Sequence, residues 1–299
     1  MNLTTYAPTV LLALGTLVVA WRQPRMHPAW TARILLLLTG ASALAVLGSL
    51  AFLVVLAIST QSPAQATLAG RALADHGRVP LPVGVSAAAL LMLITVAVGR
   101  TVLKWRAEFR DARALGTGVV PGDRPFALAV PGRDGGVVLS RGLVELLSRR
   151  ELEVVLRHEA AHIRRRHHLY LMAGSACTRV FPGLAYPYRA LRYALERWAD
   201  EDAARAVGDR VLTARTIARV ALAQASDSRG PTLADPHRTR RGLALAGSHV
   251  TRRVQALLEQ TPPDSRFTGP VLLGGAWMAT GGAISPTLTH HVSLMLLLV

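Results

Sequence analysis

The sequence predicts a mostly α-helical membrane protein, with four transmembrane helices and one cytoplasmic α+β domain. Three observations support this fold class. Apolar residues make up 51% of the 299 residues and the mean hydropathy is +0.32. Charged residues make up only 17%, against about 25% in soluble domains. The formal net charge is nevertheless +16, so the basic residues must be concentrated in a part of the chain separate from the apolar runs. Together these features exclude a disordered chain and predict membrane segments.

Four apolar runs are the expected transmembrane helices. They lie at about residues 5–21, 34–58, 81–99 and 269–289. The run at 34–58 is long enough to cross a hydrocarbon core of ~30 Å at ~1.5 Å per residue. The first run has no basic segment before it and no small-residue cleavage site, so we interpret it as a retained helix. The apolar tail at 292–299 either extends the fourth helix or lies along the membrane interface.

The charges predict the orientation of these helices. Loop 21–33 carries three arginines and no acid, whereas loop 59–82 carries two arginines and one aspartate. Segment 104–266 holds 28 Lys and Arg against 17 Asp and Glu. By the positive-inside rule, loop 21–33 and segment 104–266 are cytoplasmic, and loop 59–82 and both chain ends are outside. The expected domains are therefore three membrane helices in 1–103, a cytoplasmic domain in 104–266, and the fourth helix with the apolar tail in 267–299.

Short patterns predict the order of elements in the cytoplasmic segment. Residues 125–130 and 136–139 are expected to be short strands around a glycine-rich turn. Ser148 and Glu151 fit the S-x-x-E capping box that opens a helix. Apolar residues after Glu151 recur at helical spacing, which predicts that this helix continues through residue 163.

A pentapeptide on that helix suggests metal chemistry. His158, Glu159 and His162 form the pattern H-E-x-x-H. Two histidines four residues apart lie on one face of a helix and can bind one Zn²⁺ ion together. Glu159 then stands beside the metal, where a carboxylate can take the proton of a bound water. The alternative interpretation is a polar helix face with two hydrogen-bonded histidines.

A catalytic zinc needs a third protein ligand and one open position. The single cysteine, Cys177, lies in an apolar run and is not the expected ligand. Glu196 and Asp200, four residues apart on a second predicted helix, are the best carboxylates. We expect Glu196 to be the ligand, with Glu201 as the second choice, and Asp200 to orient a ligand histidine. The alternative is an acidic, solvated helix face.

In this order of elements, the sequence resembles gluzincin-type integral membrane zinc peptidases of bacterial membranes. One such family is the BlaR/MecR type and another is the HtpX and CAAX-prenyl-protease type. The layout of three helices before the domain and one after it is similar to the BlaR/MecR type. The resemblance implies a zincin-like domain with Zn²⁺ on His158, His162 and Glu196, and Glu159 as general base. This chain has neither the extracellular penicillin-binding sensor domain of the BlaR/MecR proteins nor an S-x-x-K serine motif.

Weaker features lie outside the motif. The segment around His249 and Arg253 resembles a helix start in both families, where either side chain could stabilise an oxyanion. An arginine that anchors two helices is the alternative. His167 and His168, five and six residues past His162, are expected to be solvated or near the membrane, and not to be ligands. The apolar stretch at 169–186 is too short to span, and is either a lid that dips into the membrane or a packing segment.

We therefore expect a zinc-dependent endopeptidase that cleaves a cytoplasmic or membrane protein. By resemblance, the substrate is a transcriptional repressor or the peptidase itself, in regulatory signalling. The first alternative is an HtpX-like quality-control protease, and the second is a non-catalytic zinc-binding scaffold. Expected partners are a protein substrate, membrane lipid and a second copy of the chain. Direct binding of nucleic acid is not expected, because no aromatic residues interleave the basic ones.

Overall fold

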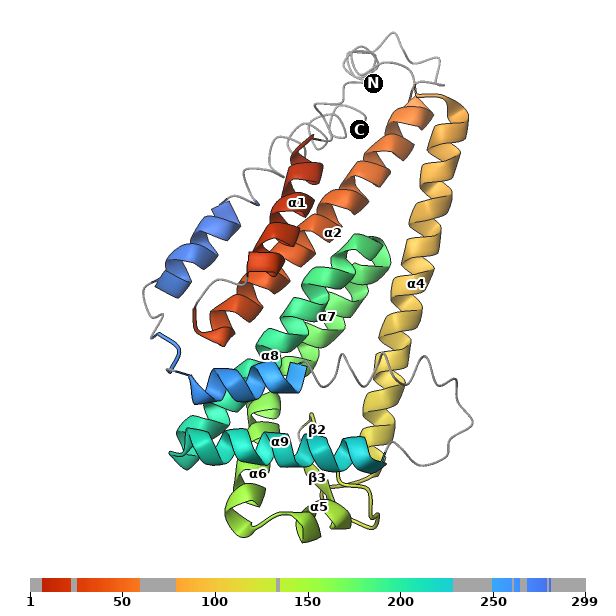
Figure 1. The fold of residues 1–299 in the computed structure, drawn as a ribbon. Helices are drawn as coiled ribbons and strands as arrows, with labels where there is room; N and C mark the ends of the chain where they lie inside the picture. The colour runs from red at the N-terminus through yellow and green to blue at the C-terminus, as the bar shows by residue number, and fades with distance from the viewer. Residues whose placement is uncertain are drawn as a thin grey trace.

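The structure, a computed structural model, describes most of the 299 residues. The description covers residues 7–22, 26–59, 79–132, 135–227, 249–259, 261–263, 268–278 and 280. Figure 1 shows a long helical bundle that continues into a smaller part, where short strands and further helices gather. The fold is therefore mostly helical with one small sheet, as the sequence predicts.

The bundle contains three long or apolar helices from the first part of the chain, α1 (Ala7–Arg22), α2 (Pro28–Ser59) and α4 (Leu81–Ala114), and α7 (His167–Val180) and α8 (Ala185–Val207) pack against them (Figure 1). In the described chain, α2 and α4 are the two helices long and apolar enough to cross a membrane. Their 32 and 34 residues correspond to lengths of roughly 50 Å, more than the ~30 Å of a hydrocarbon core. The 16 residues of α1 cover only about 24 Å.

The structure describes only part of the other membrane predictions. Residues 268–278 and 280 are helical and cover part of the expected fourth span at 269–289, but residue 279, residues 281–289 and the tail at 292–299 lie outside the described residues. Most of loop 59–82 lies outside them too. The predicted domain boundary after residue 103 falls inside α4, which runs without a break to Ala114. This helix therefore carries the bundle directly into the smaller part of the molecule.

A three-stranded sheet follows α4, in the order β1-β3-β2. The strands are β1 (Gly118–Val120), β2 (Ala127–Val130) and β3 (Gly136–Ser140). β2 runs antiparallel to β3 with Ala127 opposite Leu139, and β1 runs parallel to β3. The sequence predicted β2 and β3 within one or two residues and did not predict β1. β2 is an edge strand of this sheet, and α6 packs beside it.

The remaining elements are helical. They are α5 (Arg141–Leu146), α6 (Arg149–Arg164), α7 (His167–Val180), the 3₁₀ turn η3 (Pro182–Leu184), α8 (Ala185–Val207), α9 (Arg210–Asp227) and an unlabelled helix at 249–258. The predicted capping box is confirmed at the start of α6. The backbone N–H of Ser148 donates to the Glu151 carboxylate at 2.9 Å, and the Ser148 hydroxyl accepts from the Glu151 N–H at 3.4 Å.

One hydrophobic core joins the bundle to the smaller part. The α8 side chains of Ala190, Leu191, Ala194, Leu195 and Trp198 are buried against α1 and α2, where they meet Ala20, Ala29, Ala32 and Leu35. A second core under the sheet contains Leu139, Leu143 and Leu147. A third, made by Ala204, Ala214 and Leu257, holds helix 249–258 against α8 and α9. α8 is therefore packed against other helices on several sides, so the side chains that it presents are held in fixed positions.

Candidate active site

The two histidines of the pentapeptide lie one above the other on α6. Their Nε2 atoms are 3.1 Å apart and their ring centroids are 4.8 Å apart. This is the arrangement that the spacing of four residues imposes on a helix. Both rings are mostly buried, with exposed side-chain fractions of 14% and 17%. The two Nε2 atoms therefore face the same point in a partly enclosed space.

α8 brings a carboxylate to that point. One oxygen of Glu196 is 3.6 Å from Nε2 of His158, and the other is 3.8 Å from Nε2 of His162. One ligand atom from each of the three residues fits within 4.8 Å of the others. Zinc bonds of ~2.0–2.1 Å at a tetrahedral angle place neighbouring ligand atoms roughly 3.3 Å apart. The two Nε2 atoms, 3.1 Å apart, are close to this value, and each lies 3.6 or 3.8 Å from a different oxygen of Glu196. A small turn of the Glu196 carboxylate would bring one oxygen toward both rings, so this set of two nitrogens and one carboxylate fits a zinc ion.

The second ring nitrogen of each histidine has its own partner. Nδ1 of His158 lies 3.0 Å from a carboxylate oxygen of Asp200, and Nδ1 of His162 lies 3.0 Å from Nδ1 of His167. A proton on Nδ1 that is donated to such a partner leaves the lone pair of Nε2 for the metal. Asp200 thus contacts His158, one of the two histidines that the sequence predicts as metal ligands.

His167 was expected to be solvated or near the membrane, and its burial shows that the solvated alternative is wrong. Its side chain is fully buried, and its ring packs against Trp198 with a centroid separation of 5.0 Å. The reason is a break in the helix. Arg166 adopts left-handed backbone angles (φ 54°, ψ 40°), so α6 ends and α7 starts in a new direction that returns His167 to His162. Helical spacing counted on from His162 cannot detect such a break.

Arg253 reaches the cluster from helix 249–258. Its Nε and Nη2 donate to both oxygens of Asp200 at 2.7 and 2.6 Å, and its Nη1 lies 3.0 Å from Glu196. All three guanidinium nitrogens are thereby engaged with carboxylates. These contacts match the alternative interpretation of an arginine that anchors two helices. Through these contacts Arg253 holds the carboxylates of Glu196 and Asp200 in position.

Two other predicted residues lie away from the cluster. His249 packs against Tyr193 and its Nδ1 is 3.1 Å from the guanidinium of Arg252, on the surface. Glu201, the second choice for the third ligand, is buried in ion pairs with Arg210 and Arg197. The structure therefore groups Glu196 with the histidines and leaves Glu201 in a helix-to-helix contact.

The titratable groups have strongly shifted pKa values. Burial lowers the pKa of His158, but hydrogen bonds to Asp200 and Glu196 outweigh burial and raise it to about 10. Burial and the neighbouring His158 charge lower the pKa of His162 to about 4. Burial raises the pKa of Glu196, but the bond from His158 and the Arg253 charge outweigh it and hold this pKa well below its usual range. Without metal, the site therefore carries one imidazolium against ionised carboxylates.

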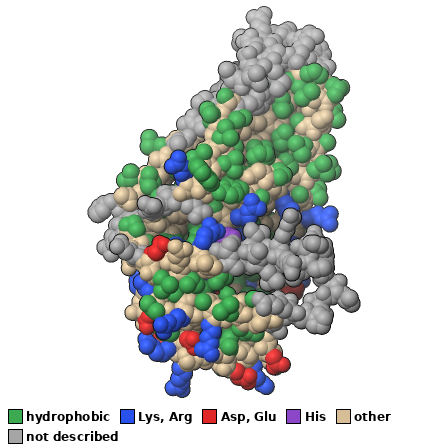
Figure 2. Space-filling view, viewed as in Figure 1, with side chains coloured by type: hydrophobic (Ala, Val, Ile, Leu, Met, Phe, Trp, Pro, Cys, Tyr) green, Lys and Arg blue, Asp and Glu red, His purple; other side chains and the backbone are tan. Residues whose placement is uncertain are grey.

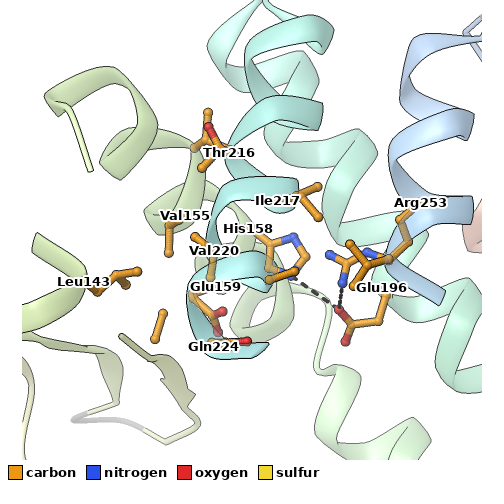
Figure 3. A pocket seen from close by; sticks show the side chains of 14 residues that line it. Leu143, Val155, His158, Glu159, Glu196, Thr216, Ile217, Val220, Gln224 and Arg253 are labelled. Carbon is orange, nitrogen blue, oxygen red and sulfur yellow. Dashed lines mark ion pairs between the residues drawn. The ribbon is translucent and has the colours of Figure 1, made fainter. Parts of the chain in front are cut away.

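Glu159 lies beside the cluster of His158, His162 and Glu196 and is not part of it. Burial raises its pKa, and the charge of His158 opposes this effect only in part. Its carboxylate accepts a hydrogen bond from the backbone N–H of Ala129 on β2. A carboxylate with a raised pKa, next to a metal and at the wall of a cavity, is suited to take and return a proton. Figure 3 shows Glu159 and His158 at the wall of this cavity, with Glu196 and Arg253 beside them.

Comparison with known proteins agrees with this chemistry over part of the chain. No match was found among curated proteins or among solved structures. A protein-family model does match one segment of the chain. This segment runs from β1 to α7, contains His158, Glu159, His162 and His167, and ends before Glu196. Members of this family are metal-dependent, usually through zinc. Residues 117–183 thus match Peptidase family M48, which supports a metallopeptidase function.

Proposed function

We propose that the protein is a zinc-dependent endopeptidase, embedded in the membrane, with its catalytic centre on the cytoplasmic side. The observation that carries the proposal is the convergence of His158, His162 and Glu196 within 4.8 Å, with Glu159 beside them. This is the set of two nitrogens, one carboxylate and one adjacent base that hydrolytic zinc sites use. A purely structural zinc site has no need of the adjacent base, which argues against a non-catalytic scaffold.

The residues divide the work of peptide hydrolysis. Zinc, when bound by the three ligand residues, would polarise the substrate carbonyl and acidify a water molecule. Glu159 would accept the proton of that water and pass it to the leaving amine. Asp200 and His167 would hold the ligand rings in the tautomer that keeps each Nε2 free of a proton. Arg253 would keep Asp200 and Glu196 ionised and in place.

Membrane embedding is supported by the surface of α4. Its apolar half leaves large side chains uncovered, such as Met92 and Leu93 with exposed fractions of 71% and 66%. A soluble domain rarely exposes such a continuous apolar surface. Figure 2 shows hydrophobic side chains spread over the bundle, while charged side chains gather at the opposite end. Lipid is the partner that this surface fits, and the excess of arginine in 104–266 favours a cytoplasmic catalytic centre.

The proposed substrate is a cytoplasmic transcriptional repressor or the peptidase itself, cleaved in regulatory signalling. This role rests on the resemblance to BlaR/MecR-type proteins, and HtpX-like quality control is the rival. An inactive variant expressed in place of the wild type separates the two. A regulatory peptidase leaves one or a few proteins uncleaved, whereas a quality-control protease leaves many unrelated membrane proteins to accumulate.

The direct test is the substitution Glu159→Gln in the full chain, purified in detergent. We expect the variant to bind one zinc per chain, as the wild type does, and to lose peptide hydrolysis by about 10²–10⁴-fold. Glu153→Gln is the matched control, because Glu153 lies on the same helix in an exposed pair with Arg157 and should leave both measurements unchanged. Wild-type protein that binds no zinc, or a Glu159→Gln variant that cleaves as fast as wild type, refutes the proposed function.

A further inference from the structure

Two cavities open on either side of the zinc-ligand cluster. One has a volume of about 200 Å³ and the other of about 290 Å³. His158, Glu159 and Glu196 line both cavities, and the other described residues that line one cavity do not line the other. Edge strand β2 passes from one to the other, since Ala127 lines the smaller cavity and Leu128 and Ala129 line the larger. An extended chain bound along β2 would therefore enter both cavities and cross the cluster between them.

The smaller cavity has aliphatic walls. Leu143 of α5 and Val155 of α6 face Ile217 and Val220 of α9, as Figure 3 shows. The α9 residues at 216, 217, 220, 221 and 224 all line it, so one face of that helix forms a continuous wall. An aliphatic cavity of about 150 Å³ holds benzene, so a cavity of this size suits a leucine, isoleucine or methionine side chain.

The larger cavity has an aromatic wall from the bundle. Trp105 and Phe109 of α4 line it, with ring centroids 5.5 Å apart. The ring of His168 meets Phe109 edge-on at 5.5 Å, with 84° between the planes. These aromatic residues follow the apolar half of α4, so a helix long enough to span a membrane reaches the catalytic cleft. Flat ring faces of this kind favour an aromatic side chain.

We propose that these cavities are the two side-chain subsites that flank the scissile bond, and that the substrate is an extended polypeptide with an aliphatic residue on one side of that bond and an aromatic residue on the other. The inference rests on the proposed function and goes beyond it, because it assigns Val220 and Phe109 as specificity-determining residues. Apolar side chains would be favoured in the parts of each cavity away from the shared His158, Glu159 and Glu196, where a charged side chain would lose its water against apolar walls.

The test uses the full chain, loaded with zinc in detergent, on a digest of a denatured proteome. Mass spectrometry of the new chain ends gives the residue preference on each side of the cleaved bond. Val220→Phe fills the smaller cavity, and we expect cleavage beside leucine to fall by about 10–200-fold relative to cleavage beside alanine. Phe109→Ala removes an aromatic wall, and we expect the aromatic preference on the other side of the bond to fall by about tenfold.

Matched controls come from the same helices. Leu222→Phe on α9 and Leu103→Ala on α4 alter exposed side chains that line neither cavity, and should leave both preferences unchanged. Zinc content and thermal unfolding show whether each variant is folded. If Val220→Phe does not fold, Val220→Ala replaces it, and the expected result is a gain of cleavage beside larger apolar residues.

The results separate this inference from the proposed function. Independent shifts, one on each side of the bond, support the two subsites. The subsites are refuted if wild-type cleavage shows no apolar preference, or if both variants slow all peptides equally. A wild type that binds zinc and cleaves nothing refutes the proposed function itself, and the subsites with it.

Discussion

Replacing Asp200 with asparagine changes one atom and one charge in the most buried carboxylate of the cluster. Its two oxygens accept three hydrogen bonds, from His158 at 3.0 Å and from Arg253 at 2.6 and 2.7 Å. An asparagine offers one oxygen and one NH₂ group in the same space. At least one of the three donors would then face another donor, whichever way the amide is turned.

The magnitude follows from this count. Loss of one hydrogen bond to a charged group costs about 1.5–3 kcal/mol. In one orientation of the amide, His158 faces its NH₂ group and loses the bond; in the other, His158 keeps only a bond to a neutral oxygen, about half as strong as one to a carboxylate. Either way the ligand histidine loses its charged partner, and we expect the zinc Kd to rise about 10–100-fold, the range seen when the outer partner of a ligand is removed. The two ranges agree, since tenfold in Kd corresponds to about 1.4 kcal/mol. Competition with a chromophoric zinc chelator measures the effect on the purified full chain.

The matched control is Asp202→Asn. Asp202 is also buried on α8 and is paired with Arg165 at 2.9 Å, but it contacts neither ligand histidine. It should lower the unfolding temperature and leave the zinc Kd unchanged. The reasoning is wrong if Asp200→Asn binds zinc as tightly as the wild type, or if both variants weaken zinc binding equally.

Three further predictions concern the same helices. His167→Ala removes the partner of His162 and should raise the zinc Kd about tenfold, whereas His168→Ala should not; the chelator assay decides, and equal values contradict the proposed contact. The pKa of His158 is raised to about 10 in the metal-free site, so zinc must displace one proton from this ring when it binds between pH 6 and 8. The zinc Kd should therefore fall about tenfold for each unit by which the pH is raised, and a Kd that does not change with pH contradicts this. Ser148→Ala removes the N-cap of α6 and should cost about 1 kcal/mol of stability in thermal unfolding, with an unchanged midpoint as the contrary result.

Local spacing predicted the parts of the site that lie within single helices. The capping box at Ser148 starts α6, and the four-residue steps from His158 to His162 and from Glu196 to Asp200 each place two side chains on one face. These relations follow from helix geometry, so they survive whatever the helices pack against. The choice of Glu196 over Glu201 was also made from the sequence, and the structure groups Glu196 with the histidines.

Tertiary packing decided the rest, and no local pattern encodes it. His167 joins the cluster because Arg166 breaks the helix, and an arginine gives no signal for left-handed backbone angles. Trp105 and Phe109 reach the cleft because α4 ends at Ala114, 15 residues beyond residue 99, where the sequence predicts the end of the membrane span. The resemblance placed both His249 and Arg253 near the metal, but only one face of helix 249–258 points inward, and Arg253 lies on it.

The position of Arg253 in the chain sets the order in which the centre is completed during synthesis. Arg253 follows Glu196 by 57 residues, and a ribosome that adds ~5–20 residues per second reaches it about 3–11 s later. During that interval Glu196 and Asp200 have been made and their guanidinium partner has not. α1, α2 and α4 precede both carboxylates, so the apolar scaffold exists before the acidic pair that it supports. If the centre binds zinc as proposed, the nascent chain would reach its final zinc affinity only after helix 249–258 docks onto α8, so metal loading would follow that docking step.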